Sequence, residues 1–236
     1  MTIDIVTLFP QVALAPLSDS IIKRAQEKGQ VEIRGHQLRD WAEGKHLKTD
    51  DYLCGGGQGM LLMPAPIFAA VRELKQRALE EGRTVPKVVL MTPQGVSFKQ
   101  SLAQSLSREY SLIILCGHYE GVDERVRYLV TQEVSLGDFV LTCGEIPALA
   151  LINGVVRLLP GTVGKEQSLK AESFEDGLLD YPQYTRPAEF RGWQVPDILR
   201  SGNHREIEGW RREQQINRTR ERRPDLWEKW LKGLRS

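Results

Sequence analysis

The chain has 236 residues, 41% hydrophobic and 27% charged, with a formal net charge of +1 at pH 7. These values are ordinary for a globular protein and exclude a largely disordered chain, a collagen or a coiled coil. No apolar run approaches the roughly 20 residues of a membrane helix, and the first residues lack the basic segment of a secretory signal.

The three cysteines, Cys54, Cys116 and Cys143, are widely spaced and form no zinc-binding pattern. They favour reduced thiols in a cytoplasmic protein. The charge is uneven along the chain, because residues 200–236 contain 11 lysines and arginines against six acidic residues. This basic section suggests a polyanionic partner, although a solvated Arg/Glu helix would look the same.

Short apolar runs alternate with helical patterns over the first 160 residues. Strands are predicted at 3–9, 31–36, 87–91, 112–116 and 133–141, and helices at 18–28, 64–81, 101–108 and 146–158. Residues 50–60 are expected to form a loop. This alternation predicts an α/β fold with a parallel sheet.

The composition changes after residue 160. Residues 161–187 are polar and rich in Gly, Ser and Pro, as in a linker, lid or binding loop. Helical patterns follow at 195–200, 205–222 and 224–234. We therefore expect an α/β domain over 1–160, a linker or lid over 161–180 and a small all-α domain over 181–236.

Glycines follow three of the apolar runs and suggest a ligand site. Thr92-Pro93-Gln94-Gly95, Gly117-His118-Tyr119-Glu120-Gly121 and Thr142-Cys143-Gly144-Glu145 each come directly after a predicted strand. Ligands of open α/β sheets bind beyond the carboxyl ends of the strands, so the three loops could hold a nucleoside-like molecule. Ordinary turns between strands and helices also need glycine, so the three loops could instead be structural turns without a ligand.

Another glycine cluster, Cys54-Gly55-Gly56-Gly57-Gln58-Gly59-Met60, fits neither a P-loop nor a dinucleotide fingerprint. It is either a flexible surface loop or a ligand loop. The absent P-loop lysine argues against a phosphotransferase. The four histidines have no metal-ligand spacing, so no metal site is predicted.

Several motifs occur in the same order as in a known family. The blocks are Leu8-Phe9-Pro10, the 55–60 loop, Thr92–Gly95, Cys116–Val126, Gly137–Thr142, Arg157–Gly161, Tyr181–Pro187 and Ser201-Gly202-Asn203-His204. In these blocks the chain resembles the bacterial tRNA (guanine-37-N1)-methyltransferases of the SPOUT superfamily. The resemblance covers nearly the whole chain and implies a deep trefoil knot in the sheet domain.

The resemblance also implies a homodimer, with each active site built from both chains. The co-substrate would be S-adenosylmethionine (AdoMet), and the product would be tRNA methylated at N1 of guanine 37, beside the anticodon. Carried over by position, the AdoMet site comprises Thr92, Pro93, Gln94, Gly95, Gly117, Glu120, Leu136, Gly137, Asp138, Phe139, Val140, Leu141, Gly144 and Pro147.

The catalytic positions of the family fall on Glu172 and Arg157. A carboxylate can remove the N1 proton as a general base, and a guanidinium can stabilise the charge that develops on O6. Members of the family also use Mg²⁺. Substrate binding is assigned to Gly55, Gly56, Gly57, Gly59, Met60, His204, Arg211, Arg212 and Arg218, because arginines track phosphates and an open loop can admit a splayed base.

The chain departs from the family pattern at three positions. Cys54 and Cys143 replace the usual Tyr and Gly, and the base position is Glu172 where the family has Asp. Asp176 and Asp180 are alternative bases. Two other functions are consistent with these departures: an AdoMet- and RNA-binding module with weakened catalysis, and a SPOUT enzyme acting on another RNA base.

Overall fold

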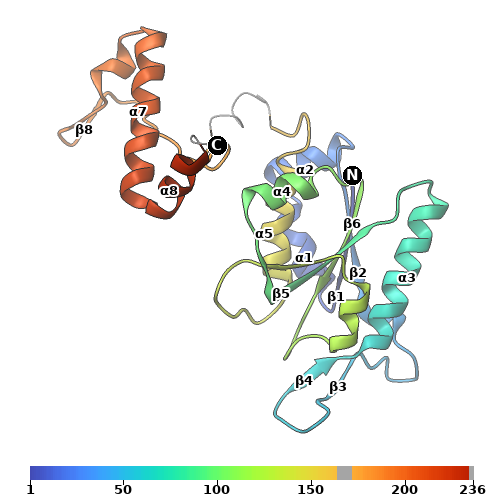
Figure 1. Ribbon diagram of the computed structural model, residues 1–236. Helices are drawn as coiled ribbons and strands as arrows, with labels where there is room; N and C mark the ends of the chain where they lie inside the picture. The colour runs from blue at the N-terminus through green and yellow to red at the C-terminus, as the bar shows by residue number, and fades with distance from the viewer. Residues whose placement is uncertain (164–171, 234–236) are drawn as a thin grey trace. The chain divides into compact units, whose positions relative to one another are not determined.

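The structure is a computed structural model that describes residues 1–163 and 172–233. It divides into two compact units, Met1–Gly164 and Lys165–Ser236 (Figure 1). Residues 164–171 of the expected linker lie outside the described residues. No helix in the described part of the chain is long and apolar enough to cross a membrane.

A five-stranded parallel sheet forms the centre of the first unit, which confirms the predicted α/β class. Its order is β2-β1-β6-β5-β7. The strands are β1 (Thr2–Thr7), β2 (Glu32–Gln37), β5 (Lys87–Ser97), β6 (Ser111–Cys116) and β7 (Gln132–Ser135). Every residue of β1 and β6 is buried, as expected for central strands covered on both faces.

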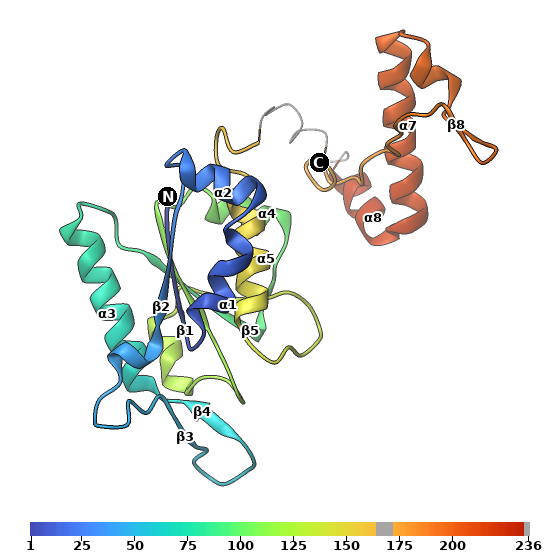
Figure 2. The same cartoon turned by 180° about the vertical axis from the view of Figure 1, so that it is seen from behind.

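Helices cover both faces of this sheet (Figures 1 and 2). One face carries α1 (Pro10–Leu14), α2 (Ser20–Glu27), α4 (Gln100–Leu106) and α5 (Glu145–Val156); the other carries α3 (Pro64–Glu80). Each face has its own hydrophobic core. Successive side chains of β6 point to opposite faces, so Ile114 packs in the core beneath α1, α2, α4 and α5, and Ile113 packs in the core beneath α3. Single 3₁₀ segments lie at Ala15–Leu17, Leu38–Trp41 and Glu124–Leu129.

Three local predictions were wrong in the first unit. β5 continues to Ser97, six residues beyond its expected end, because a register shift between Met91 and Val96 lets it keep pairing with β7. The strand expected over 133–141 ends at Ser135, whose hydroxyl accepts a hydrogen bond from the amide of Gly137.

The expected loop over 50–60 contains a hairpin of β3 (Asp50–Tyr52) and β4 (Met60–Leu62), with the glycines at its tip.

The second unit contains α7 (His204–Arg222) and α8 (Pro224–Gly233), which confirms the C-terminal helices. The Asn203 side chain caps α7 by accepting from the amide of Glu206. The helix expected over 195–200 is only a 3₁₀ turn, Asp197–Arg200. A two-residue hairpin, β8 (Glu189–Phe190) with β9 (Trp193–Gln194), was not predicted, so this unit is not purely helical.

Candidate functional site

The loops after β5, β6 and β7 meet at one edge of the sheet and line a pocket of about 310 Å³. This size lies at the lower end of small-molecule sites, about 300–1,000 Å³. β5 lies between β6 and β7 in the sheet, so these loops become neighbours through the strand order.

Most of the residues expected to hold AdoMet line this pocket. They are Thr92, Pro93, Gln94, Gly117, Glu120, Leu136, Gly137, Phe139, Val140, Leu141, Gly144 and Pro147. Gly95 and Asp138 are not among its lining residues. A Cβ at Gly95 would overlap the backbone nitrogen of Val134, so this glycine allows β5 to approach β7 closely at the register shift between the two strands.

Two glycines hold the loops after β6 and before α5 together. The amide of Gly144 donates a 2.8 Å hydrogen bond to the carbonyl of Gly117. A Cβ at Gly144 would lie 2.6 Å from the Gly117 nitrogen, so the two backbones need a glycine there. The half-buried Cys143, where the family usually has Gly, forms a β-bridge with His118 and lines the pocket.

His118 belongs to the pocket although no role was assigned to it from the sequence. Its ring lies between Phe9, 5.1 Å away between ring centroids, and Tyr119, 4.7 Å away. Its Nδ1 is buried without a hydrogen-bond partner among the described residues, an arrangement that calls for an explanation such as a ligand. Its place directly after Gly117 in a strand-end motif was the available signal.

A buried carboxylate follows the pocket-lining residue Gly144. Glu145, the first residue of α5, is fully buried and accepts a hydrogen bond from the hydroxyl of Thr7 on β1. A carboxylate at a helix N-terminus also benefits from the helix dipole. Burial, together with the charge of Glu145 and the nearby Cys143, raises the pKa of the Cys116 thiol well above its usual value.

The acid-rich segment Glu120–Arg125 leads into the 3₁₀ helix Glu124–Leu129. The Asp123 side chain caps it by accepting from the amide of Arg125, and the paired Arg125 guanidinium lowers the pKa of the Asp123 carboxyl. Asp123 therefore has the structural role of a helix cap, whereas Glu120 lines the pocket.

The glycine hairpin lies beside the same pocket. Its strand β4 is joined to the loop after β6, since the amide of Glu120 donates to the carbonyl of Met60 and the amide of Leu62 donates to that of Gly121. A Cβ at Gly59 would lie 2.6 Å from Oε1 of Glu120. Gly55, Gly56 and Gly57 have positive φ angles and open space around them at the tip.

Arg157 lies at the opposite end of α5 from the pocket. α5 starts at the pocket with Gly144 as its N-cap and ends with Arg157 as its C-cap. At 1.5 Å per residue these positions are ~20 Å apart along the helix axis. Arg157 is half-buried and is not among the residues that line the pocket of its own chain.

The half-buried Glu172 belongs to the second unit, in a turn that packs on α7. Asp176 of this turn forms an ion pair with Arg212 of α7. The Asp180 carboxylate accepts hydrogen bonds from the amide of Tyr181, at 2.7 Å, and from the side chain of Gln183. Both alternative bases thus hold this segment in place.

The other expected RNA-binding residues lie along α7. His204 is exposed at its first turn, and Arg218 is half-buried towards its C-terminal end. Arg212 lies 5.6 Å from the ring centroid of Trp230 in addition to its pairing with Asp176, so it joins α7, α8 and the 172–178 turn. Arg211 lines a separate pocket of the second unit, formed with the 181–188 segment.

The first unit has the architecture of a nucleoside-binding α/β enzyme, with glycine-bearing loops at the carboxyl ends of parallel strands. The family model described as "tRNA (Guanine-1)-methyltransferase TrmD" matches residues 1–229, and the chain belongs to this family.

Three relatives are similar to this chain over nearly their whole length. The tRNA (guanine-N(1)-)-methyltransferase of Microcystis aeruginosa is 59% identical over 98% of both chains. Those of Gloeothece citriformis and Acaryochloris marina are also 59% identical, over 98% of this chain and 98% and 97% of their own. The chain is therefore a methyltransferase of this class.

Proposed function

We propose that this enzyme transfers the methyl group of AdoMet to N1 of guanine 37 in tRNA. The observation that carries the proposal is the meeting of the three strand-end loops in one pocket, in a chain whose family is the tRNA (guanine-1)-methyltransferases. When bound, AdoMet supplies a methyl group activated by a positively charged sulfur.

The pocket residues suit a ligand with a flat ring system and a ribose. Leu136, Val140 and Pro147 offer apolar surface, and the carboxylate of Glu120 can accept hydrogen bonds from ribose hydroxyls. The buried, unpartnered Nδ1 of His118 offers a further polar contact. The donor set therefore fits AdoMet.

Magnesium has less support in the structure. Among residues 1–163 and 172–233, no three His, Cys, Asp or Glu side chains lie close enough together to hold a metal ion. The roles proposed below belong to protein side chains, and Mg²⁺ is implied by the family resemblance alone.

Glu172 is proposed as the general base and Arg157 as the group that stabilises O6. As the N1–methyl bond forms and the sulfur–methyl bond breaks, the N1 proton passes to the Glu172 carboxylate. The guanidinium of Arg157 stabilises the negative charge that moves onto O6 as N1 loses its proton. Asp176 and Asp180 stay the alternative bases; Asp176 is paired with Arg212, and the Asp180 carboxylate accepts hydrogen bonds from Tyr181 and Gln183.

The position of Arg157 supports a homodimer with shared active sites. Because α5 separates Arg157 from the pocket of its own chain by ~20 Å, this side chain can reach the O6 of a guanine only at the pocket of another chain. A second copy of the chain would supply that pocket. The trefoil knot implied by the resemblance is also part of this proposal. The hydrogen bond from the Gly144 amide to the Gly117 carbonyl would hold the loops of the knot together.

The test is a methyl-transfer assay with labelled AdoMet and two anticodon stem-loop RNAs, carrying guanine or adenine at position 37. We expect 1-methylguanosine only on the guanine RNA, identified by nucleoside mass spectrometry. Glu172→Gln and Arg157→Ala should each lower turnover by ~10²–10⁴-fold, the usual contribution of such groups, with AdoMet affinity unchanged.

Matched variants separate the candidate bases. Glu175→Gln changes an exposed carboxylate in the same turn as Glu172 and should keep wild-type turnover. Asp176→Asn and Asp180→Asn should act through RNA affinity and stability. Full turnover of Glu172→Gln, or a larger loss in either aspartate variant, would contradict the assignment of the base. Tight binding of both ligands without methyl transfer would favour the binding-module alternative.

A further inference from the structure

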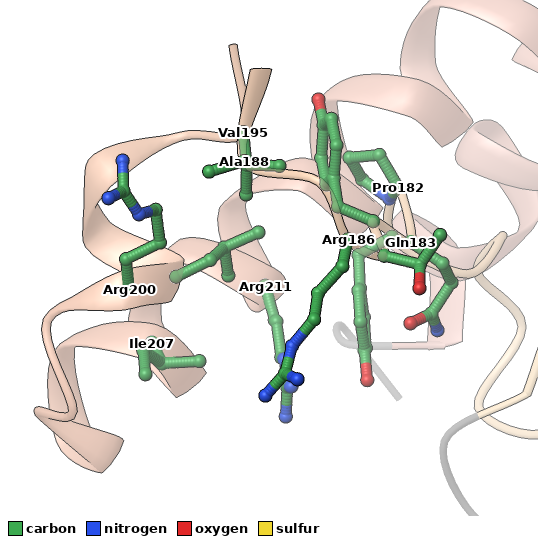
Figure 3. A pocket seen from close by; sticks show the side chains of 12 residues that line it. Pro182, Gln183, Arg186, Ala188, Val195, Arg200, Ile207 and Arg211 are labelled. Carbon is green, nitrogen blue, oxygen red and sulfur yellow. The ribbon is translucent and has the colours of Figure 1, made fainter. Parts of the chain in front are cut away.

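A second pocket, of about 530 Å³, lies wholly within the C-terminal unit (Figure 3). Its lining comes from the 181–188 segment, the end of β9, the 3₁₀ turn and α7. The residues are Tyr181, Pro182, Gln183, Tyr184, Thr185, Arg186, Ala188, Val195, Leu199, Arg200, Ile207 and Arg211.

The charge of this lining is one-sided. It contains three arginines and no carboxylate. In the described part of the chain Arg186 has no ion pair, and Arg200 has only a long one, 3.7 Å, to the fully exposed Asp197. Figure 3 shows Arg186 and Arg211 extending in the same direction and Arg200 in the opposite one. Two guanidinium groups directed to one end, without a counter-charge, suit an anion such as phosphate.

The position of Arg211 is set by stacking. Its guanidinium lies 4.8 Å from the ring centroid of Tyr181, and its Nε is buried without a hydrogen-bond partner among the described residues. Stacking leaves the other N–H groups of the guanidinium available to a ligand. Arg211 therefore has both a fixed position and unused donors.

The rest of the lining is apolar or aromatic. Val195, Leu199 and Ile207 form an apolar wall, and the ring of Tyr184 is half-exposed. Hydrogen bonds fix the frame, since the amide of Val195 donates to the carbonyl of Ala188 and the amide of Leu179 donates to the hydroxyl of Thr219 on α7. A ring-shaped group can lie against this wall while its anionic end reaches the arginines.

We propose that this pocket binds one unstacked nucleotide of the RNA substrate, with its phosphate at Arg186 and Arg211 and its base against Tyr184. Single-stranded RNA is typically held in this way, by aromatic stacking of a base beside a cationic contact to the backbone. The inference rests on the proposed function for the identity of the RNA. It assigns to the C-terminal unit a single-nucleotide site in addition to the phosphate contacts of α7.

The test measures RNA binding by the full-length protein, with a fluorescent anticodon stem-loop RNA and anisotropy at several salt concentrations. Arg186→Ala and Tyr184→Ala should each weaken binding about 10-fold or more, the scale of one stacked or charge-paired nucleotide. Arg186→Ala should also reduce the salt dependence of log K by ~0.7, the contribution of one phosphate contact on a single strand. Arg186→Lys should restore that slope.

Lys229→Ala serves as the control, since Lys229 is exposed on α8 and does not line the pocket. It removes the same charge from the same unit and should change the affinity less than 2-fold. AdoMet affinity, measured by calorimetry, should be equal in all variants. If Arg186→Ala binds RNA as tightly as Lys229→Ala, the proposal is wrong. A changed oligomeric state in Arg186→Ala, with RNA affinity retained, would instead make the pocket a protein contact.

The two proposals fail separately in these experiments. Wild-type protein that forms 1-methylguanosine while Arg186→Ala binds RNA normally would overturn the nucleotide pocket and leave the function. Wild-type protein that forms no 1-methylguanosine, but whose RNA binding depends on Arg186 and Tyr184, would overturn the function and support the pocket.

Discussion

The pockets of the two units differ in whether backbone loops or side chains form their walls. In the first unit, backbone loops at the ends of buried strands enclose the pocket, and glycines set how closely these loops approach. In the second unit, side chains surround the pocket, and they include three arginines, two tyrosines and an apolar wall of Val195, Leu199 and Ile207.

This difference matches the ligands proposed for the two pockets. A cavity with backbone walls has a fixed shape and can select a small molecule by fit, because a packed core resists deformation. A pocket of guanidinium groups and tyrosines instead offers charge and stacking, which suit a flexible polyanion. Substitutions should therefore affect shape and stability in the first unit and affinity and salt dependence in the second.

The largest effect that can break this comparison is expected at Gly95. Gly95→Ala places a methyl group against the backbone of β7, and such overpacking should cost about 3 kcal/mol of unfolding free energy. For a chain of this size the melting temperature should fall by ~10 °C. Differential scanning fluorimetry measures the shift.

Gly209→Ala provides the matched substitution in the second unit. Gly209 lies within α7, and no neighbouring atom lies within 4 Å of the place that an alanine methyl group would take, so alanine should stabilise the helix by ~1 kcal/mol. Equal losses at Gly95 and Gly209 would show that the two units do not differ in how tightly they are packed.

The three cysteines of the first unit report how accessible its surface, its pocket and its core are to a reagent. Cys54 is exposed, Cys143 is half-buried in the pocket and Cys116 is buried. Iodoacetamide should modify Cys54 first and Cys116 only after unfolding, since its pKa is raised and it is inaccessible. Saturating AdoMet should slow alkylation of Cys143 about 10-fold or more, by occupying ~90% of the sites or more.

Mass spectrometry of each modified cysteine follows these rates in one sample, with Cys54 as the internal control. Equal protection of Cys54 and Cys143, or none at Cys143, would contradict the placement of AdoMet between the strand-end loops.

A smaller effect is expected from the pH dependence of stability. The Cys116 thiol has a pKa near 8.5 when unfolded and a higher one when folded. The folded chain therefore retains a proton that the unfolded chain loses, and stability falls as the pH rises above about 8.5. Between pH 7.5 and 9.5 the wild type should lose ~1 kcal/mol more than Cys116→Ala in urea unfolding. Parallel curves for the two proteins would contradict this role of Cys116.

The sequence predicted those elements whose signal is local. The apolar run 112–116 and the long helical patterns at 64–81 and 205–222 all formed as expected. The extension of β5 through Thr92–Ser97 was missed because pairing with β7, a tertiary contact, keeps a polar and glycine-bearing segment extended. The hairpin at 189–194 was missed for a similar reason, since two-residue strands carry no period.

The candidate site was predictable where its residues stand together in the sequence. The blocks after each strand pointed to one pocket, because parallel strands end at the same edge of a sheet. The place of Arg157 was not predictable in this way, since only the direction of α5 shows that it ends far from that pocket. The pocket at Tyr181–Arg211 required four segments to be brought together in space.

The close contact between Gly59 and Glu120 has a thermodynamic consequence. Glu120 lines the pocket of the strand-end loops on one side and lies against Gly59 of the glycine hairpin on the other, so a ligand that fixes its side chain should also restrict the hairpin. If the hairpin binds the RNA base, as expected from the sequence, the two substrates share a coupling free energy through this carboxylate. Reciprocity then requires that AdoMet changes the affinity for RNA by the same factor by which RNA changes the affinity for AdoMet.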